Sequence, residues 1–221
     1  MVLLRYDPPT APQFEVLYQD NSLIVLNKPS GLLTVPGREL VHRDSLSYRV
    51  QRVYPTVQVV HRLDMATSGV IVMALHPKAH RELNRQFRER ETAKRYYAWV
   101  YGRPEQDGGS IALPLCCDWP NRPRHMVSLE HGKHALTHWR CLKRLADRSL
   151  LELTPITGRS HQLRVHMLSL GHPILGDNLY AQGPALEMAP QLQLHAALLE
   201  FRHPRTKQWL SFSTTAPFSM E

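Results

Sequence analysis

Cysteine is scarce in this sequence, and the spacing of its few copies excludes two kinds of structural site. The cysteines are Cys116, Cys117 and Cys141, and no pair has the C-x-x-C spacing. An odd count without that spacing indicates neither a disulfide framework nor a zinc ribbon. We therefore expect a protein whose thiols stay reduced.

Long apolar runs are also missing. No stretch approaches the roughly 18 consecutive apolar residues of a membrane-spanning helix. The first residues lack the basic start and the longer apolar run of a signal peptide. The sequence therefore predicts a soluble, cytoplasmic protein with no membrane partner.

Acidic side chains are outnumbered by basic ones. Lys and Arg number 27 against 19 Asp and Glu, which gives a net charge of +8, and the pI is about 9.7. Between Lys78 and Arg103, eight basic residues stand against three acidic ones, so this window alone carries +5. Concentrated positive charge is typical of a protein that binds a polyanion such as nucleic acid.

The length and composition fit a single folded core. A chain of 221 residues with 43% hydrophobic side chains lies at the upper size for one such core. One domain, or two closely fused lobes, is therefore expected. The sequence shows neither an internal repeat nor a low-complexity tract.

Apolar and β-branched runs predict where the strands lie. Residues 69–75 form a continuous apolar run, which predicts a strand buried on both faces at the centre of a sheet. The stretch 103–133 is rich in turn residues, and a connection of this length is more often functional than decorative. Other strands are predicted at residues 23–27, 96–101, 135–142, 150–155, 194–201 and 208–212.

Helical spacing predicts three helices, of which the first and last are short. Asp44 is expected to cap the first, and Pro55 to stop it. The last is expected over residues 160–170 and ends at Gly171, the usual helix stop.

The middle helix, predicted over residues 77–90, has one apolar and one cationic face. Its apolar residues recur every four positions. Its other face carries Arg81, Arg85 and Arg88, which either follow an RNA backbone or simply solvate the helix. The local excess of +5 favours RNA, because an ordinary solvated face mixes charge signs more evenly.

A polar segment, His-Arg-Leu-Asp-Met-Ala-Thr-Ser-Gly at residues 61–69, comes immediately before the buried strand. This position puts its side chains at the rim of a sheet, where reactive groups usually lie. Asp64 is the candidate catalytic carboxylate. The ordinary interpretation is that Asp64 caps a turn or pairs with Arg62.

Two further segments carry polar groups that suit a reactive site. Residues 158–167 place two guanidinium and two imidazole groups around the start of a helix, and Tyr96 directly follows Lys94 and Arg95. Each segment alone has an ordinary explanation, as surface side chains on a helix or as a tyrosine packed at a strand edge.

Together, these segments resemble the RluA-type family of pseudouridine synthases. The motifs occur in the family's order over most of the chain. They are VLNKPSGL at 25–32, HRLDMATSG at 61–69, KRY at 94–96, GRSHQLRVH at 158–166 and GHPILGD at 171–177. The segment CDWPNRP at 117–123 is similar to that of short, dual-specificity members, which modify large-subunit ribosomal RNA and a tRNA anticodon stem-loop.

The resemblance implies an isomerase that converts uridine to pseudouridine in structured RNA, without metal or cofactor. A carboxylate suffices as nucleophile or as acid and base at the sugar. The family's catalytic aspartate falls on Asp64, and its partner Arg164 would keep that carboxylate ionised. Tyr96 matches the tyrosine that stacks on the target base. Arg62 is implied to fill the space that the flipped uridine leaves.

Other basic side chains are candidate RNA contacts. Lys28 either meets phosphate or is a solvated lysine at a turn. Cations in the loop-rich stretch are candidates for substrate selection, because inserted loops often bind splayed-out bases. The whole set is Arg62, Lys28, Arg81, Arg85, Arg88, Arg122, Arg124, Lys133, Arg159 and His161.

The 13 histidines do not indicate a metal site. His161 and His166 do not have the i, i+4 spacing of a zincin helix, and no acid lies between them in the H-E-x-x-H manner.

The fold that the resemblance implies is α+β, with a mixed, mostly antiparallel central sheet flanked by helices and loops around an active-site cleft. Residues 1–221 are expected to form one catalytic domain and a monomer. The S4-like N-terminal module of longer family members is expected to be absent, because only 60 residues precede His61.

Two other functions are also compatible with the basic surfaces and the motifs of this sequence. An RNA-binding or ribosome-assembly protein without activity would need the basic surfaces alone, and the presence of Asp64, Tyr96 and Arg164 argues against it. An N-glycosidase would let water capture the ribosyl group, so that the treated RNA loses a base and therefore mass.

Overall fold

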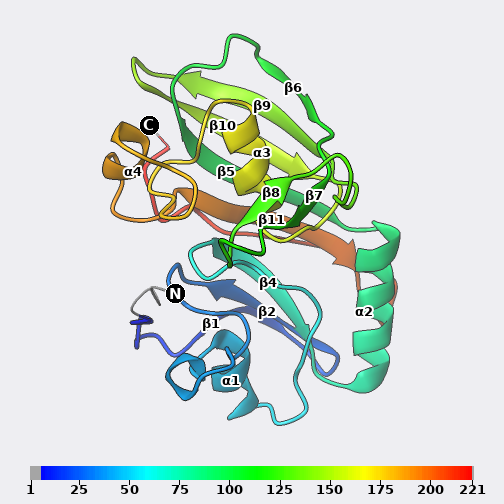
Figure 1. Cartoon of the computed structure of the whole chain (residues 1–221). Coiled ribbons are helices and arrows are strands. Elements are labelled where there is room, and N and C mark those ends of the chain that lie inside the picture. The colour runs from blue at the N-terminus through cyan, green and yellow to red at the C-terminus, as the bar shows by residue number, and fades with distance from the viewer. Residues whose placement is uncertain (1–5, 221) are drawn as a thin grey trace. The chain divides into compact units, whose positions relative to one another are not determined.

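The computed structural model describes residues 6–220, which form two compact units (Figure 1). The first unit comprises residues up to Ala93 together with Ala196–Pro217, and the second comprises Lys94–His195 and the residues from Phe218. Residues 1–5, on which part of the expectation about a signal peptide rests, lie outside the described range. The expectation of one catalytic domain stays a prediction.

The first unit is built on antiparallel strands. β1 (Glu15–Gln19) pairs with β2 (Leu23–Lys28), and β2 pairs with β4 (Ser68–Ala74). The short β3 (Gln58–Val59) pairs with β4 as well. All of β4 is buried, as its continuous apolar run predicts.

A second strand pair completes this unit. β11 (Leu194–Arg202), most of which lies here, pairs antiparallel with β12 (Trp209–Ser213). β4 lies next to β11 in the sheet, and Gly69 permits this close approach. A Cβ atom on Gly69 would lie 2.2 Å from the carbonyl oxygen of Ala196, which real Cβ atoms never tolerate.

The helices of the first unit are η1 (Leu40–His42), α1 (Leu46–Gln51) and α2 (Pro77–Glu89). The cap predicted for α1 is wrong by one residue. Ser45 caps the helix by accepting from the Tyr48 amide at 3.3 Å. Asp44 instead binds the buried Arg49 with both carboxylate oxygens, at 2.6 and 2.8 Å.

α2 agrees with its prediction and packs on β4 (Figure 1). His76 caps it, because the imidazole Nδ1 accepts from the Ala79 amide at 3.1 Å. Ala79 and Leu83 join a core cluster that includes Val70 and Phe201. The apolar face therefore holds the helix, and the cationic face remains outside the core.

The second unit contains an antiparallel sheet in the order β5, β10, β9, β6. These strands are β5 (Ala93–Tyr101), β10 (Arg148–Pro155), β9 (Thr137–Arg144) and β6 (Gly108–Ile111). β9 and β10 form the predicted pair. Trp99, Leu150 and Leu175 make one of the core clusters of this unit.

The predicted loop-rich stretch contains β6 and a separate two-stranded sheet. β7 (Leu115–Cys117) pairs with β8 (His125–Val127), and both are too short to show an alternating sequence pattern. The helices are α3 (Gln162–Ser169) and the one-turn α4 (Pro184–Glu187). α3 begins later than expected because His161 has a left-handed backbone, with φ of 55°.

These two units, with antiparallel strands and few helices, confirm the α+β class. Among residues 6–220, none of the helices has the length and apolar composition to cross a bilayer.

Candidate active site

Asp64 is half-buried in the loop between β3 and β4, and a second loop holds its backbone rigidly. The Leu63 carbonyl accepts from the Thr34 hydroxyl at 2.7 Å, and the Ala66 carbonyl accepts from the Ser30 hydroxyl at 2.8 Å. The Thr67 amide closes a turn onto the Asp64 carbonyl at 3.1 Å.

Met65, next to Asp64, receives two further donors from the same second loop. Its carbonyl accepts from the Gly31 amide at 2.9 Å and from the Lys28 ammonium at 3.0 Å. Two motifs that lie far apart in the sequence therefore form one structure. Every carbonyl from residue 63 to 66 has a donor, so the orientation of the Asp64 backbone is set before any substrate arrives.

Lys28 has a different environment from the one expected. The side chain is 0% exposed, and its ammonium also donates to the carbonyls of Pro29 at 2.8 Å and Leu32 at 2.6 Å. Burial lowers the pKa of Lys28 to about 7, and the Asp64 charge partly offsets that shift. A buried lysine with three carbonyl acceptors neither meets phosphate nor is solvated, so both expectations for Lys28 are corrected.

Arg62, two residues before Asp64, is exposed. The neighbouring His61 points inward, where its ring stacks on Phe87 of α2 at a centroid distance of 4.4 Å and its Nε2 accepts from the Val72 amide at 3.2 Å. The loop that carries Asp64 thus has one inward-pointing side chain, His61, and one exposed guanidinium, that of Arg62.

Arg164 lies on α3 and is only 3% exposed. Its Nε and Nη2 donate to the two carboxylate oxygens of Asp177, at 2.8 and 2.6 Å. Asp177 is itself held by the amides of Leu179 at 3.0 Å and Tyr180 at 3.3 Å. The GHPILGD motif therefore supplies the carboxylate that orients the family arginine, a function that the sequence analysis did not assign.

Tyr180 is a second residue that the sequence analysis missed. Its hydroxyl accepts from the His125 amide at 2.7 Å and lies 2.7 Å from Nδ1 of His161. Arg124 and Arg164 both lie over its ring, at 5.3 and 5.1 Å from the centroid. No spacing rule links residue 180 to these groups, so no sequence signal pointed to it.

This cluster leaves two buried polar atoms without a hydrogen bond among the described residues, Arg124 Nε and His125 Nδ1. Such atoms are rare in folded proteins. His125 is the first residue of β8 and Arg124 directly precedes it, so both lie inside the loop-rich stretch that was expected to select the substrate.

The remaining candidates of the second unit lie at its surface. Arg122 covers the ring of the exposed Trp119 at 4.6 Å. Lys133 is exposed beside β7, and Arg159 is exposed and donates from Nε to the His134 carbonyl at 3.0 Å.

Tyr96 is half-buried on β5, opposite Leu153 of β10.

Asp64 belongs to the first unit, whereas Tyr96 and Arg164 belong to the second. That these three side chains meet at one site stays a prediction.

On α2 the three predicted arginines differ from one another. Arg81 is exposed, and Arg88 is exposed and touches Glu89 at 3.3 Å. Arg85 binds Glu82 at 3.0 Å, Glu91 at 2.7 Å and also Glu89. Its charge is balanced within the protein, and its role as an RNA contact stays a prediction.

Within residues 6–220, no group of three or more His, Cys, Asp or Glu side chains is placed to hold a metal ion.

Comparison with known proteins identifies the family. Residues 22–169 match the RNA pseudouridylate synthase family. The dual-specificity RNA pseudouridine synthase RluA of Salmonella typhi is 55% identical over 219 residues, which cover 99% of this chain and 100% of that protein. The protein of the same name from Escherichia coli (strain K12) is 54% identical over the same shares of both chains.

A solved structure supports the same assignment. Human RNA pseudouridylate synthase domain containing 1 superposes with a TM-score of 0.79 at 28% identity, covering 96% of this chain and 87% of that one. This chain therefore belongs to the RNA pseudouridylate synthase family. The predicted resemblance is confirmed, and with it the class of enzyme, an isomerase that forms pseudouridine in RNA.

Proposed function

We propose that this chain isomerises specific uridines in large-subunit ribosomal RNA and in a tRNA anticodon stem-loop, with Asp64 as the catalytic carboxylate. The full-length similarity to proteins named as dual-specificity synthases supports two substrates. The observation that carries the proposal for Asp64 is the loop around it, in which each carbonyl from residue 63 to 66 accepts a hydrogen bond.

The chemistry needs this rigidity. The C1′–N1 bond breaks, the uracil turns over, and C1′ joins C5; the proton on C5 leaves and N1 gains one. Substrate and product therefore have the same mass. A carboxylate serves at the sugar or the base only if it is already aimed, because reorganisation during the reaction would add to the barrier.

Other residues act on the RNA in this proposal. Tyr96 stacks on the target base and lets it rotate, and the exposed Arg62 occupies the space of the flipped uridine. Arg164 pairs with the Asp64 carboxylate. Other cations contact the RNA; they are Arg81, Arg88, Arg122, Arg124, Lys133 and Arg159, with His161 on the same unit as the last four.

The test is replacement of Asp64 by Ala. Pseudouridine formation should fall below about one-thousandth of the wild-type rate, since removing a catalytic nucleophile or acid costs at least that much. RNA binding should largely survive. Nucleoside content and RNA mass give the readout, and Asp107→Ala is the matched control because that carboxylate is 92% exposed.

Three results contradict the proposal. If Asp64→Ala stays active, the assignment of the carboxylate is wrong. If the wild-type protein lowers the mass of the RNA, it removes the base and is a glycosidase. If it leaves uridine intact, it only binds RNA.

We also propose that the protein works in the cytoplasm as a monomer. Sedimentation at working concentration tests the oligomeric state, and a stable dimer would contradict it.

A further inference from the structure

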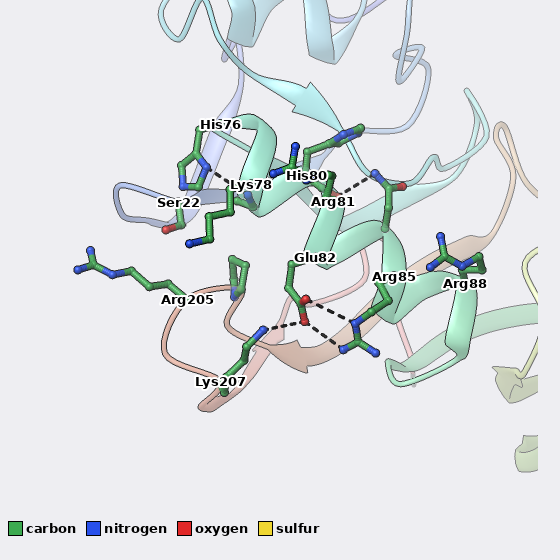
Figure 2. Close-up of a pocket in the computed structure, with 13 residues that line it drawn as sticks. Ser22, His76, Lys78, His80, Arg81, Glu82, Arg85, Arg88, Arg205 and Lys207 are labelled. Carbon is green, nitrogen blue, oxygen red and sulfur yellow. Dashed lines mark hydrogen bonds and ion pairs between the residues drawn. The ribbon is translucent and has the colours of Figure 1, made fainter.

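A hollow of about 1060 Å³ lies on the first unit between α2 and the turn that joins β11 to β12 (Figure 2). Lys78 reaches into it from the start of α2, and Arg205 and Lys207 approach it from the turn. Glu82 is the one acidic residue among the described residues that line it.

Some of these cations are balanced by neighbouring acids. Glu82 binds Arg85 at 3.0 Å and Lys207 at 2.9 Å, and these hydrogen bonds lower the pKa of Glu82 to about 2. Figure 2 shows Glu82 between these two partners. Arg85 also binds Glu89 and Glu91. This group is an internal ion network that fixes side chains and adds little net charge.

Three other cations at the hollow have no such balance. Lys78, Arg81 and Arg205 are exposed, and within residues 6–220 none of them forms an ion pair. An exposed positive charge without a partner attracts a polyanion more strongly than a paired one, because no internal bond must be broken first.

The surface that carries these three charges is formed in advance. Gln86 is fully buried, and its side-chain amide donates to the Arg202 carbonyl at 2.9 Å and accepts from the Arg202 amide at 2.8 Å. These two bonds fix α2 against the end of β11. Binding therefore spends little free energy on ordering the two elements.

The turn itself is also held. His203 is buried, and its Nδ1 accepts from the amides of Arg205 at 3.2 Å and Thr206 at 2.9 Å. Its Nε2 lies 2.7 Å from the Asp20 carboxylate, which accepts a hydrogen bond from the N–H group of the ring. Arg205 thus projects from a rigid backbone.

The hollow and Asp64 lie toward opposite ends of β4. Asp64 precedes the first residue of β4. Ser22 and His76 line the hollow, and both lie at the other end of β4: Ser22 accepts from the amide that follows the strand, and His76 comes two residues after Ala74. Seven strand residues span about 20 Å. Phosphates along an A-form RNA duplex advance somewhat less per step than the roughly 3.4 Å of DNA, so this distance corresponds to about seven base pairs.

We propose that Lys78, Arg81 and Arg205 bind the phosphate backbone of a helical part of the substrate RNA, outside the loop that holds the target uridine. This inference rests on the proposed function, since it takes RNA as the substrate. Because its contacts are to phosphates, this surface does not distinguish one base sequence from another. It selects RNAs whose stem is long enough to reach from Asp64 to the hollow.

The experiment compares two RNAs that share one target loop, one with a stem of about five base pairs and one with about fifteen, longer than the span of the hollow. The variant is Lys78→Gln, Arg81→Gln, Arg205→Gln. We expect the ratio of kcat/KM for the long RNA to that for the short RNA to fall about tenfold, through KM. The dependence of log kcat/KM on log salt for the long RNA should become less steep by about 2 to 3.

The matched control is Arg38→Gln, Arg43→Gln, Arg52→Gln, which removes the same charge from exposed residues of the same unit. It should leave the ratio within twofold of wild type. Thermal unfolding of both variants should match the wild-type protein, because all six side chains are exposed.

An unchanged ratio in the hollow variant overturns the proposal, and so does an equal fall in the control, which would reflect net charge alone. Binding of an acidic protein by the hollow, with RNA kinetics unchanged, overturns it as well. Failure of the wild-type protein to convert even the short RNA would instead contradict the proposed function, so the two failures are distinguishable.

Discussion

Each of the two units buries a basic side chain that belongs to a family motif, Lys28 in the first unit and Arg164 in the second, but the partners of the two side chains differ. In the first unit, the Lys28 ammonium donates to three neutral carbonyls. In the second, the Arg164 guanidinium binds both oxygens of the Asp177 carboxylate. The side chains are 0% and 3% exposed, so burial alone does not account for the difference.

The difference follows from what each group does when it is buried. An ammonium whose acceptors are neutral carbonyls is only partly compensated, here by the charge of Asp64, and burial lowers the pKa of Lys28 to about 7, so that it lies close to losing its proton. A guanidinium cannot lose its proton in a protein. It therefore needs a carboxylate, and the GHPILGD motif provides one.

The largest expected effect comes from breaking the charged pair. Replacing Asp177 by Asn leaves the Arg164 charge buried without that carboxylate, which should lower the free energy of unfolding by about 3–5 kcal/mol. Chemical denaturation measures this change. Asp107→Asn is the control, because Asp107 is 92% exposed beside Arg144 and should change stability by less than about 1 kcal/mol.

The same variant separates stability from catalysis. Under conditions in which the Asp177→Asn variant is still folded, Arg164 lacks the carboxylate that orients it. The kcat of the variant should therefore fall more than its affinity for RNA. Equal stability of Asp177→Asn and Asp107→Asn would show that the buried pair does not need its carboxylate.

A smaller effect is expected from the titration of Lys28. Its pKa is about 7 in the folded state, whereas a solvated lysine has 10.5. Between these pH values the unfolded chain binds a proton that the folded chain has released, so stability rises with pH. From pH 7 to pH 9 this contribution is about 2 kcal/mol.

Lys28→Met removes the titrating group and therefore tests how much of the dependence of stability on pH is due to Lys28. The variant loses three hydrogen bonds and is less stable throughout, but its stability should lack the rise of about 2 kcal/mol that the wild-type protein shows between pH 7 and pH 9. Denaturant midpoints at several pH values measure it. Parallel curves for the two proteins would refute a depressed pKa at Lys28.

The smallest effect concerns His166, another buried base, which lies on α3 two residues after Arg164. Its ring nitrogens lie 2.9 Å from the Thr137 hydroxyl and 3.0 Å from the Leu113 carbonyl, and burial lowers its pKa. Below its ordinary value of 6.5 the unfolded chain takes up a proton first, so stability falls as the pH falls.

His166→Gln should therefore lose less stability than the wild-type protein when the pH falls from 7 to 5, and denaturant midpoints at the two pH values measure the difference. His131→Gln is the control, because that ring is 76% exposed. An identical acid response of His166→Gln and wild type would show that burial does not lower the pKa of His166.

Local patterns in the sequence predicted most of the elements. The continuous apolar run became the fully buried β4, and the four-residue recurrence around Leu83 became α2. These signals are reliable because they depend on neighbours within one strand or one turn of helix. The motifs also identified the family, since ordered segments along the whole chain carry more information than any one of them.

The partners of charged residues were less predictable. Asp44 looked like a helix cap, but Ser45 took that place and Asp44 bound Arg49. Arg85 looked like an RNA contact, but three glutamates surround it. Local spacing shows that such groups lie on one face, and it does not show which of them pair.

By itself, the sequence determined the class of the fold, the family, the buried central strand and the cationic helix, because each depends on local periodicity or on ordered motifs. Only the tertiary structure decided that Lys28 is an internal donor to Met65, 37 residues away, and that Gln86 fixes Arg202, 116 residues away. Hydrogen bonds across such separations depend on how strands and helices pack, and chain periodicity does not contain that information.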